Sequence, residues 1–175
     1  MNRRTRASIL AVLISATALL SGCSSTQPAP EDALAIGTGI PVEVGAGVEM
    51  SFAIDDVRQG EVSDLSAMGV QTPSSVEGKT PYFVTYSITL TDGDIADADR
   101  DALPVPAAED WTLHGDGAYE PMKVYGQFDC TKDGSGSNAV SPDAPLVGCQ
   151  VFLGKADALP TAVEVKDRGV WTTKD

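Results

Sequence analysis

Basic residues are scarce in this chain of 175 residues. Lys and Arg total 12 against 25 Asp and Glu, so the formal net charge is −13. Three of the basic residues, Arg3, Arg4 and Arg6, precede position 23, where no acidic residue occurs. From position 23 onward, nine basic residues oppose 25 acidic ones, a net charge of −16. This balance argues against nucleic acid as a partner and against electrostatic docking on an anionic lipid surface, because both need a basic patch.

Side chains that carry catalysis are also few. The chain has one histidine, His114, and three cysteines, Cys23, Cys130 and Cys149. It contains no His-Glu-x-x-His and no Cys-x-x-Cys motif, and the stretch 134–137 lacks the residue order of a nucleophile elbow. We therefore expect no enzymatic activity.

No apolar run is long enough to span a membrane. The longest, residues 9–20, has 12 residues, whereas a spanning helix needs about 20. A short apolar run after Arg3, Arg4 and Arg6 is typical of an export signal. We therefore predict a signal peptide over residues 1–22.

The signal ends in Leu20-Ser21-Gly22-Cys23, which resembles the lipobox of bacterial lipoproteins. The resemblance implies cleavage before Cys23, which then carries a diacylglyceryl thioether and usually an amide-linked acyl chain such as palmitate. Two or more chains form a stable membrane anchor. The expected location is the outer face of the cytoplasmic membrane; the alternative is an ordinary secretory signal with an incidental cysteine.

The two other cysteines, Cys130 and Cys149, form an even set in an extracytoplasmic protein. This favours a disulfide between them, worth about 3 kcal/mol by loop-closure entropy. Free thiols or a two-cysteine metal site are the alternatives, and the metal site lacks partners because His114 is the only histidine.

Proline and small polar residues dominate the stretch that follows Cys23. Without hydrophobic periodicity, such a stretch is typical of a flexible tether. We assign residues 23–37 to this tether and residues 38–175 to one folded domain.

Alternation with a period of two dominates that domain. Apolar residues alternate with polar or small ones over 48–55 and 82–91, and shorter candidates are 40–44, 111–114, 119–128, 149–153, 163–166 and 170–172. No helical periodicity of a dozen residues occurs outside the signal. Half-exposed antiparallel strands predict an all-β fold, an immunoglobulin-like antiparallel β-sandwich of about seven strands.

Three long loops separate these strands, at 59–79, 92–110 and 131–146. Two predicted strands lie between the second and third loops, so both should lie at the same end of the sandwich. The turn at Ala46 belongs to that end if loop 59–79 contains no strand. The tether should then leave from the opposite end, with the acidic loop pointing away from the membrane.

Five aspartates concentrate in loop 92–110: Asp92, Asp94, Asp97, Asp99 and Asp101. The spacing of the last three resembles the start of an EF-hand loop, but Ala102 and Ala108 stand where that motif needs Gly and Glu. An irregular calcium site, to which Asp133 and Asp143 could add ligands, is one interpretation. A solvated acidic loop without cofactor is the preferred one, and a short helix is the third.

The aromatic residues are expected in the core rather than on a ligand platform. This applies to Trp111 and Trp171, and to the tyrosines at 82, 86, 119 and 125. His114 is expected on the surface in a turn.

The lipobox, the strand patterns at 48–57 and 82–90, and the Cys130/Cys149 pair resemble small exported actinobacterial lipoproteins with immunoglobulin-like domains. That family implies a fold and a location but no settled activity. We therefore expect a non-enzymatic binding module whose partner is a protein or another component of the cell envelope, met through the acidic loop end. The alternative is a calcium-binding module using loop 92–110.

Overall fold

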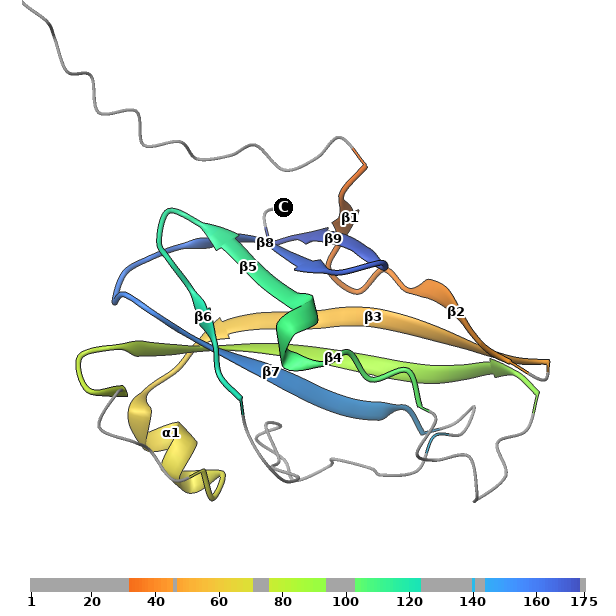
Figure 1. Cartoon of the computed structure of the whole chain (residues 1–175), viewed down its shortest axis with the longest axis horizontal. Coiled ribbons are helices and arrows are strands. Elements are labelled where there is room, and N and C mark those ends of the chain that lie inside the picture. The colour runs from red at the N-terminus through yellow and green to blue at the C-terminus, as the bar shows by residue number, and fades with distance from the viewer. Residues whose placement is uncertain are drawn as a thin grey trace, which may run out of the picture.

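The chain folds into two β-sheets packed face to face (Figure 1). The structure, a computed structural model, describes residues 32–45, 47–70, 76–93, 103–123, 140 and 144–173. The five-stranded sheet has the order β2-β3-β4-β7-β6 and the four-stranded sheet the order β1-β9-β8-β5. The expected all-β sandwich is confirmed. Nine strands occur among the described residues instead of about seven, and two of them have only two residues.

The elements of the five-stranded sheet are β2 (Ile40–Gly45), β3 (Val48–Gln59), β4 (Thr80–Asp92), β6 (Glu120–Pro121) and β7 (Leu146–Gly154). Those of the four-stranded sheet are β1 (Leu34–Ala35), β5 (Trp111–Gly115), β8 (Pro160–Val165) and β9 (Gly169–Thr172). A short helix, α1 (Val62–Ala67), and a 3₁₀ turn (Ala108–Asp110) complete the fold. No helix in the described part of the chain is long and apolar enough to cross a membrane.

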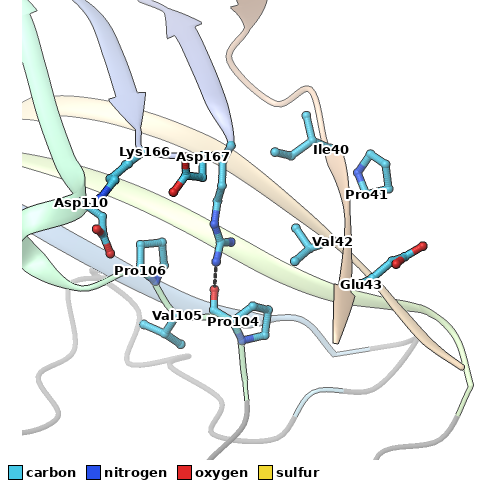
Figure 2. A pocket seen from close by; sticks show the side chains of 11 residues that line it. Ile40, Pro41, Val42, Glu43, Pro104, Val105, Pro106, Asp110, Lys166 and Asp167 are labelled. Atoms are coloured by element: carbon cyan, nitrogen blue, oxygen red, sulfur yellow. Dashed lines mark hydrogen bonds between the residues drawn. The ribbon is translucent and has the colours of Figure 1, made fainter. Parts of the chain in front are cut away.

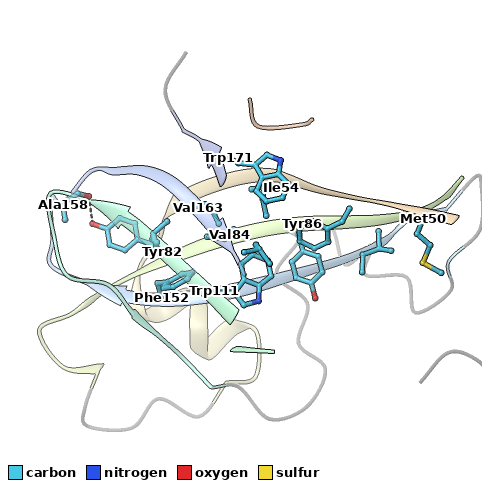
Figure 3. Close-up of a cluster of buried hydrophobic side chains, with 14 of the residues drawn as sticks. Met50, Ile54, Tyr82, Val84, Tyr86, Trp111, Phe152, Ala158, Val163 and Trp171 are labelled. Carbon is cyan, nitrogen blue, oxygen red and sulfur yellow. Dashed lines mark hydrogen bonds between the residues drawn. The ribbon is translucent and has the colours of Figure 1, made fainter. Parts of the chain in front are cut away.

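Alternating side chains of β3 and β4 build the main core between the sheets. Phe52 contacts the rings of Tyr86, Trp111 and Trp171, with centroid distances of 5.5, 6.1 and 5.7 Å. Figure 3 shows Tyr86, Trp111 and Trp171 within this buried cluster. Both tryptophans are at most 3% exposed, so their expected place in the core is confirmed. Among the tyrosines, Tyr82 and Tyr86 are buried, whereas position 125 lies outside the described residues.

The loop expected over 59–79 contains α1. The helix is capped by Glu61, whose backbone N–H donates to the Asp64 carboxylate over 3.0 Å. Leu65 on its inner side is fully buried against a second cluster on the outer face of the five-stranded sheet, which includes Phe83 and Val151. Six residues are too few for a visible helical period, which explains why the pattern did not predict it.

Strand pairing brings the ends of the long loops together. Asp92 at the end of β4 pairs with Glu49, and Leu146 at the start of β7 pairs with Ile88. The expectation that loops 92–110 and 131–146 share one end is confirmed for these strand ends. The end of β2 and the start of β3 lie at the same end, since Gly45 pairs with Val48 and Glu49 pairs with Asp92.

The chain crosses from the four-stranded to the five-stranded sheet between β1 and β2. β1 pairs in parallel with β9, with Leu34 opposite Trp171. The Trp171 indole N–H then donates to the Thr38 carbonyl over 2.8 Å, and β2 begins two residues later in the opposite sheet. Leu34 and Ala35, which lie within the stretch 23–37 that we expected to be a tether, thus pair with the last strand of the four-stranded sheet.

Candidate functional site

A groove opens between the two sheets beside β2 (Figure 2). Its volume is about 560 Å³, within the range of roughly 300–1,000 Å³ typical of ligand pockets. Three segments line it: residues 40–43 of β2, residues 104–106 with Asp110, and the β8–β9 turn at residues 166–168. Each segment contributes a distinct part of the site.

β2 forms one wall because it is the edge strand of its sheet. Ile40 and Val42 are half-buried against the main core, whereas Pro41 and Glu43 alternate with them and are exposed. Proline is tolerated on an edge strand, where its missing N–H breaks no ladder bond if the nitrogen faces outward. This wall is therefore apolar, with a carboxylate at its rim.

Pro104, Val105 and Pro106 form the opposite wall. The Trp111 indole N–H donates to the Pro106 carbonyl over 3.4 Å, and the Val105 N–H donates to the Leu103 carbonyl over 2.7 Å. The Val105 side chain remains 48% exposed. The Val105 side chain thus lies exposed at the rim of the groove, and hydrogen bonds of the surrounding backbone fix its position.

Arg168 lies between the walls and forms the floor. Its guanidinium lies 4.5 Å from the centroid of the Phe52 ring, and its Nη2 donates to the Pro104 carbonyl. Nη1 is buried with no hydrogen-bond partner among the described residues. Burial lowers the pKa of Arg168, while the nearby Tyr86 hydroxyl and Asp110 carboxylate act in the opposite direction. The positive charge of Arg168 is therefore turned inward, toward the core.

The remaining charges lie at the rim. Glu43, Asp167 and Lys166 are exposed, and Asp110 is half-buried. The Asp110 carboxylate accepts the Ala107 N–H over 2.9 Å, which fixes the 3₁₀ turn beside the groove. The groove thus combines apolar walls with charged groups that could orient a ligand.

The residues predicted to bind calcium are mostly outside the described part of the chain. Asp92 is described, and its carboxylate accepts the N–H of Gly93 over 2.9 Å. The other four, Asp94, Asp97, Asp99 and Asp101, lie outside the described residues. Across the described ranges, no group of three His, Cys, Asp or Glu side chains could hold a metal ion. The calcium site therefore stays a prediction.

Two of the three cysteines with a predicted role also lie outside the described residues. Cys23 and Cys130 lie outside the described residues, whereas Cys149 lies in β7, opposite Thr85. The disulfide and the lipid attachment stay predictions. His114 lies in β5 instead of a turn, with Nε2 2.8 Å from the Glu164 carboxylate on the neighbouring β8.

Sequence reasoning did not predict the groove. The only local signal is the apolar Pro104-Val105-Pro106 segment that interrupts a loop otherwise rich in acidic residues. The groove forms only because this segment lies beside β2 and the β8–β9 turn, each at least 60 residues away along the chain.

No protein-family model matches the chain, and neither a curated protein nor a solved structure matches it. The site is therefore interpreted from its own geometry.

Proposed function

We propose that this chain is a lipid-anchored, non-enzymatic binding module of the cell envelope that holds a protein partner in the groove beside β2. The anchor is the acylated Cys23, on the outer face of the cytoplasmic membrane. The finer assignment of the sandwich as immunoglobulin-like belongs to the same proposal. Loop 92–110, through which we expected the partner to be met, leads directly into the groove wall at residues 104–106.

The observation that carries the proposal is the mixed lining of the groove, in which exposed apolar side chains lie beside exposed charged ones. Val105 is 48% exposed, and Pro41 is exposed on the facing wall. Apolar side chains surrounded by a polar, solvent-accessible rim are a feature of protein–protein interfaces. The rim of this groove carries Glu43, Lys166 and Asp167.

The described part of the lining lacks the side chains of a serine, threonine or cysteine nucleophile paired with a histidine base. Its eleven described residues are Ile, Val, Pro, Glu, Asp, Lys and Arg, which include no hydroxyl, thiol or imidazole group. Burial raises the pKa of Tyr86, which interacts with Arg168, to about 12, although Arg168 acts in the opposite direction. A phenol with that pKa stays protonated at neutral pH and is a weak general base.

Photo-cross-linking from single positions tests the proposal. Benzoylphenylalanine is introduced in place of Val105 at the groove or in place of Val62, an exposed valine of α1, and intact cells are irradiated. We expect a discrete protein adduct from position 105 that is absent from position 62. The adduct should disappear when Pro41→Asp is added to the opposite wall. Equal adducts from both positions, or none from position 105, would contradict the proposal.

A further inference from the structure

We propose that the partner enters the groove as an extended segment in which Lys or Arg side chains flank apolar ones. This inference rests on the proposed function and specifies the chemistry of the partner. Two properties of the groove carry it: its hydrogen-bonding groups and its unpaired rim charges.

The groove walls offer acceptors but few donors. Pro41, Pro104 and Pro106 have no backbone N–H, and the N–H of Val105 is already bonded to the Leu103 carbonyl. The carbonyls of these residues have two lone pairs each, and Glu43, Asp110 and Asp167 add carboxylate oxygens. A ligand rich in donors suits such walls, and Lys and Arg supply three and five N–H donors without any acceptor.

The rim charges favour the same ligand. Within the described residues, neither Glu43 nor Asp167 forms an ion pair, and both are exposed. Arg168 does not neutralise them at the surface, because its guanidinium stacks on Phe52 and bonds to the Pro104 carbonyl. Lys166 is the one exposed base among the lining residues. The chain's net charge of −13 strengthens attraction for a cationic segment at long range.

The dimensions of the groove favour an extended segment. Residues Ile40–Glu43 form one wall in strand conformation, and four residues of strand span about 13 Å. An extended partner segment of similar length would place alternate side chains toward the apolar walls and toward the charged rim. Pro41 prevents a continuous backbone ladder with β2, so side chains should provide most of the recognition. For the same reason, a second copy of this chain pairing edge to edge through β2 is disfavoured.

Three synthetic peptides of equal length test the inference. They alternate Val with Lys, Val with Glu, or Val with Ser, and their binding to the full chain purified from membranes is measured by fluorescence anisotropy. We expect the Val-Lys peptide to bind at least tenfold more tightly than the Val-Glu peptide. Its affinity should fall as salt is raised, because exposed charges are screened.

Matched variants locate the binding. Glu43→Gln should weaken the Val-Lys peptide about two- to fivefold, the range expected when one exposed ion pair is removed. Glu77→Gln makes the same charge change on an exposed residue beside α1 and should have no effect. Val105→Ser should weaken every peptide that binds, whereas Val62→Ser should not.

The outcomes separate the inference from the proposed function. Equal binding of Val-Lys and Val-Ser peptides, both sensitive to Val105→Ser, would overturn the cationic preference but leave the groove as a binding site. Equal weakening by Glu43→Gln and Glu77→Gln would mean that charge attraction is not localised there, and would also overturn the inference. No binding of the Val-Lys peptide at millimolar concentration overturns it as well. The proposed function fails on its own if the cross-link at position 105 is absent.

Discussion

Arg168 lies with its guanidinium 4.5 Å from the centroid of the Phe52 ring, so one side chain joins the groove to the aromatic core. The same guanidinium donates to the carbonyl of Pro104 on the far wall. The β8–β9 turn, β3 and the segment 104–106 are thereby held together at a single point. The shape of the groove depends on this contact.

Replacing Arg168 by Met should reduce the free energy of unfolding by about 1–3 kcal/mol, because a charge-assisted hydrogen bond and a cation–π contact are lost together. Methionine keeps much of the apolar part of the arginine side chain, so the loss in free energy of unfolding measures the contribution of the guanidinium. Urea unfolding measures the effect. Lys166→Met, two residues earlier and exposed, should change stability by no more than about 0.5 kcal/mol. Equal costs for the two variants would contradict this role.

The Tyr82 hydroxyl lies 2.8 Å from the carbonyls of both Lys155 and Ala158, and thereby fixes the turn between β7 and β8. Tyr82→Phe should cost about 1–2 kcal/mol in thermal or urea unfolding, because buried carbonyls lose their donor. Tyr119 provides the control, since its buried hydroxyl has no partner among the described residues. Tyr119→Phe should be neutral or stabilising, and a loss as large as that of Tyr82→Phe would refute the distinction.

Gly148 in β7 leaves room for the ring of Tyr86, its cross-strand neighbour on β4. A Cβ at position 148 would clash with Cζ and the hydroxyl oxygen of Tyr86. Gly148→Ala should therefore cost about 1–3 kcal/mol through overpacking. In a Tyr86→Leu background the same change should cost less, because the two sites are coupled. Additive costs in a double-mutant cycle would show that the ring is not the cause.

Cys130→Ser should lower the melting temperature under oxidising conditions if Cys130 and Cys149 form the predicted disulfide. The expected loss is about 3 kcal/mol, from the loop-closure entropy of the unfolded chain. In reductant, the wild type and the variant should melt together. Equal melting temperatures without reductant would rule out the disulfide.

Cys23→Ala should move the protein from the membrane fraction to the soluble fraction, because the acylated cysteine is the proposed anchor. Quantitative immunoblotting of the two fractions measures the shift. Cys130→Ala is the matched control and should stay with the membrane. Retention of the Cys23→Ala protein in the membrane would contradict the lipoprotein assignment.

Much of the sandwich could be predicted because burial on one face imposes a period of two on the sequence. In β4, Tyr82, Tyr86 and Ile88 all face the main core as their alternation indicates. One-face alternation also indicates antiparallel strands, and counting antiparallel strands then placed the start of the acidic loop at the same end as the start of β7. These inferences need only local patterns and connectivity.

The groove could not be predicted in the same way. It depends on residues 40–43, 104–106 and 166–168 meeting, and no local pattern records which distant segments become neighbours. The role of Arg168 is a clear case, since a basic residue in a turn normally faces solvent. Likewise, the two-residue β1 lies in a stretch without periodicity, and only its pairing with β9 makes it a strand.

The pairing of β1 with β9 also determines when the core can form during folding. β9 ends at Thr172, and Trp171 packs on Phe52 and receives Leu34 as its strand neighbour. A chain that emerges N-terminus first must therefore deliver nearly all of its 175 residues before the core closes. Such long-range contacts slow folding. For a chain exported as proposed, slow closure of the core would favour an unfolded polypeptide during passage through the translocation pore.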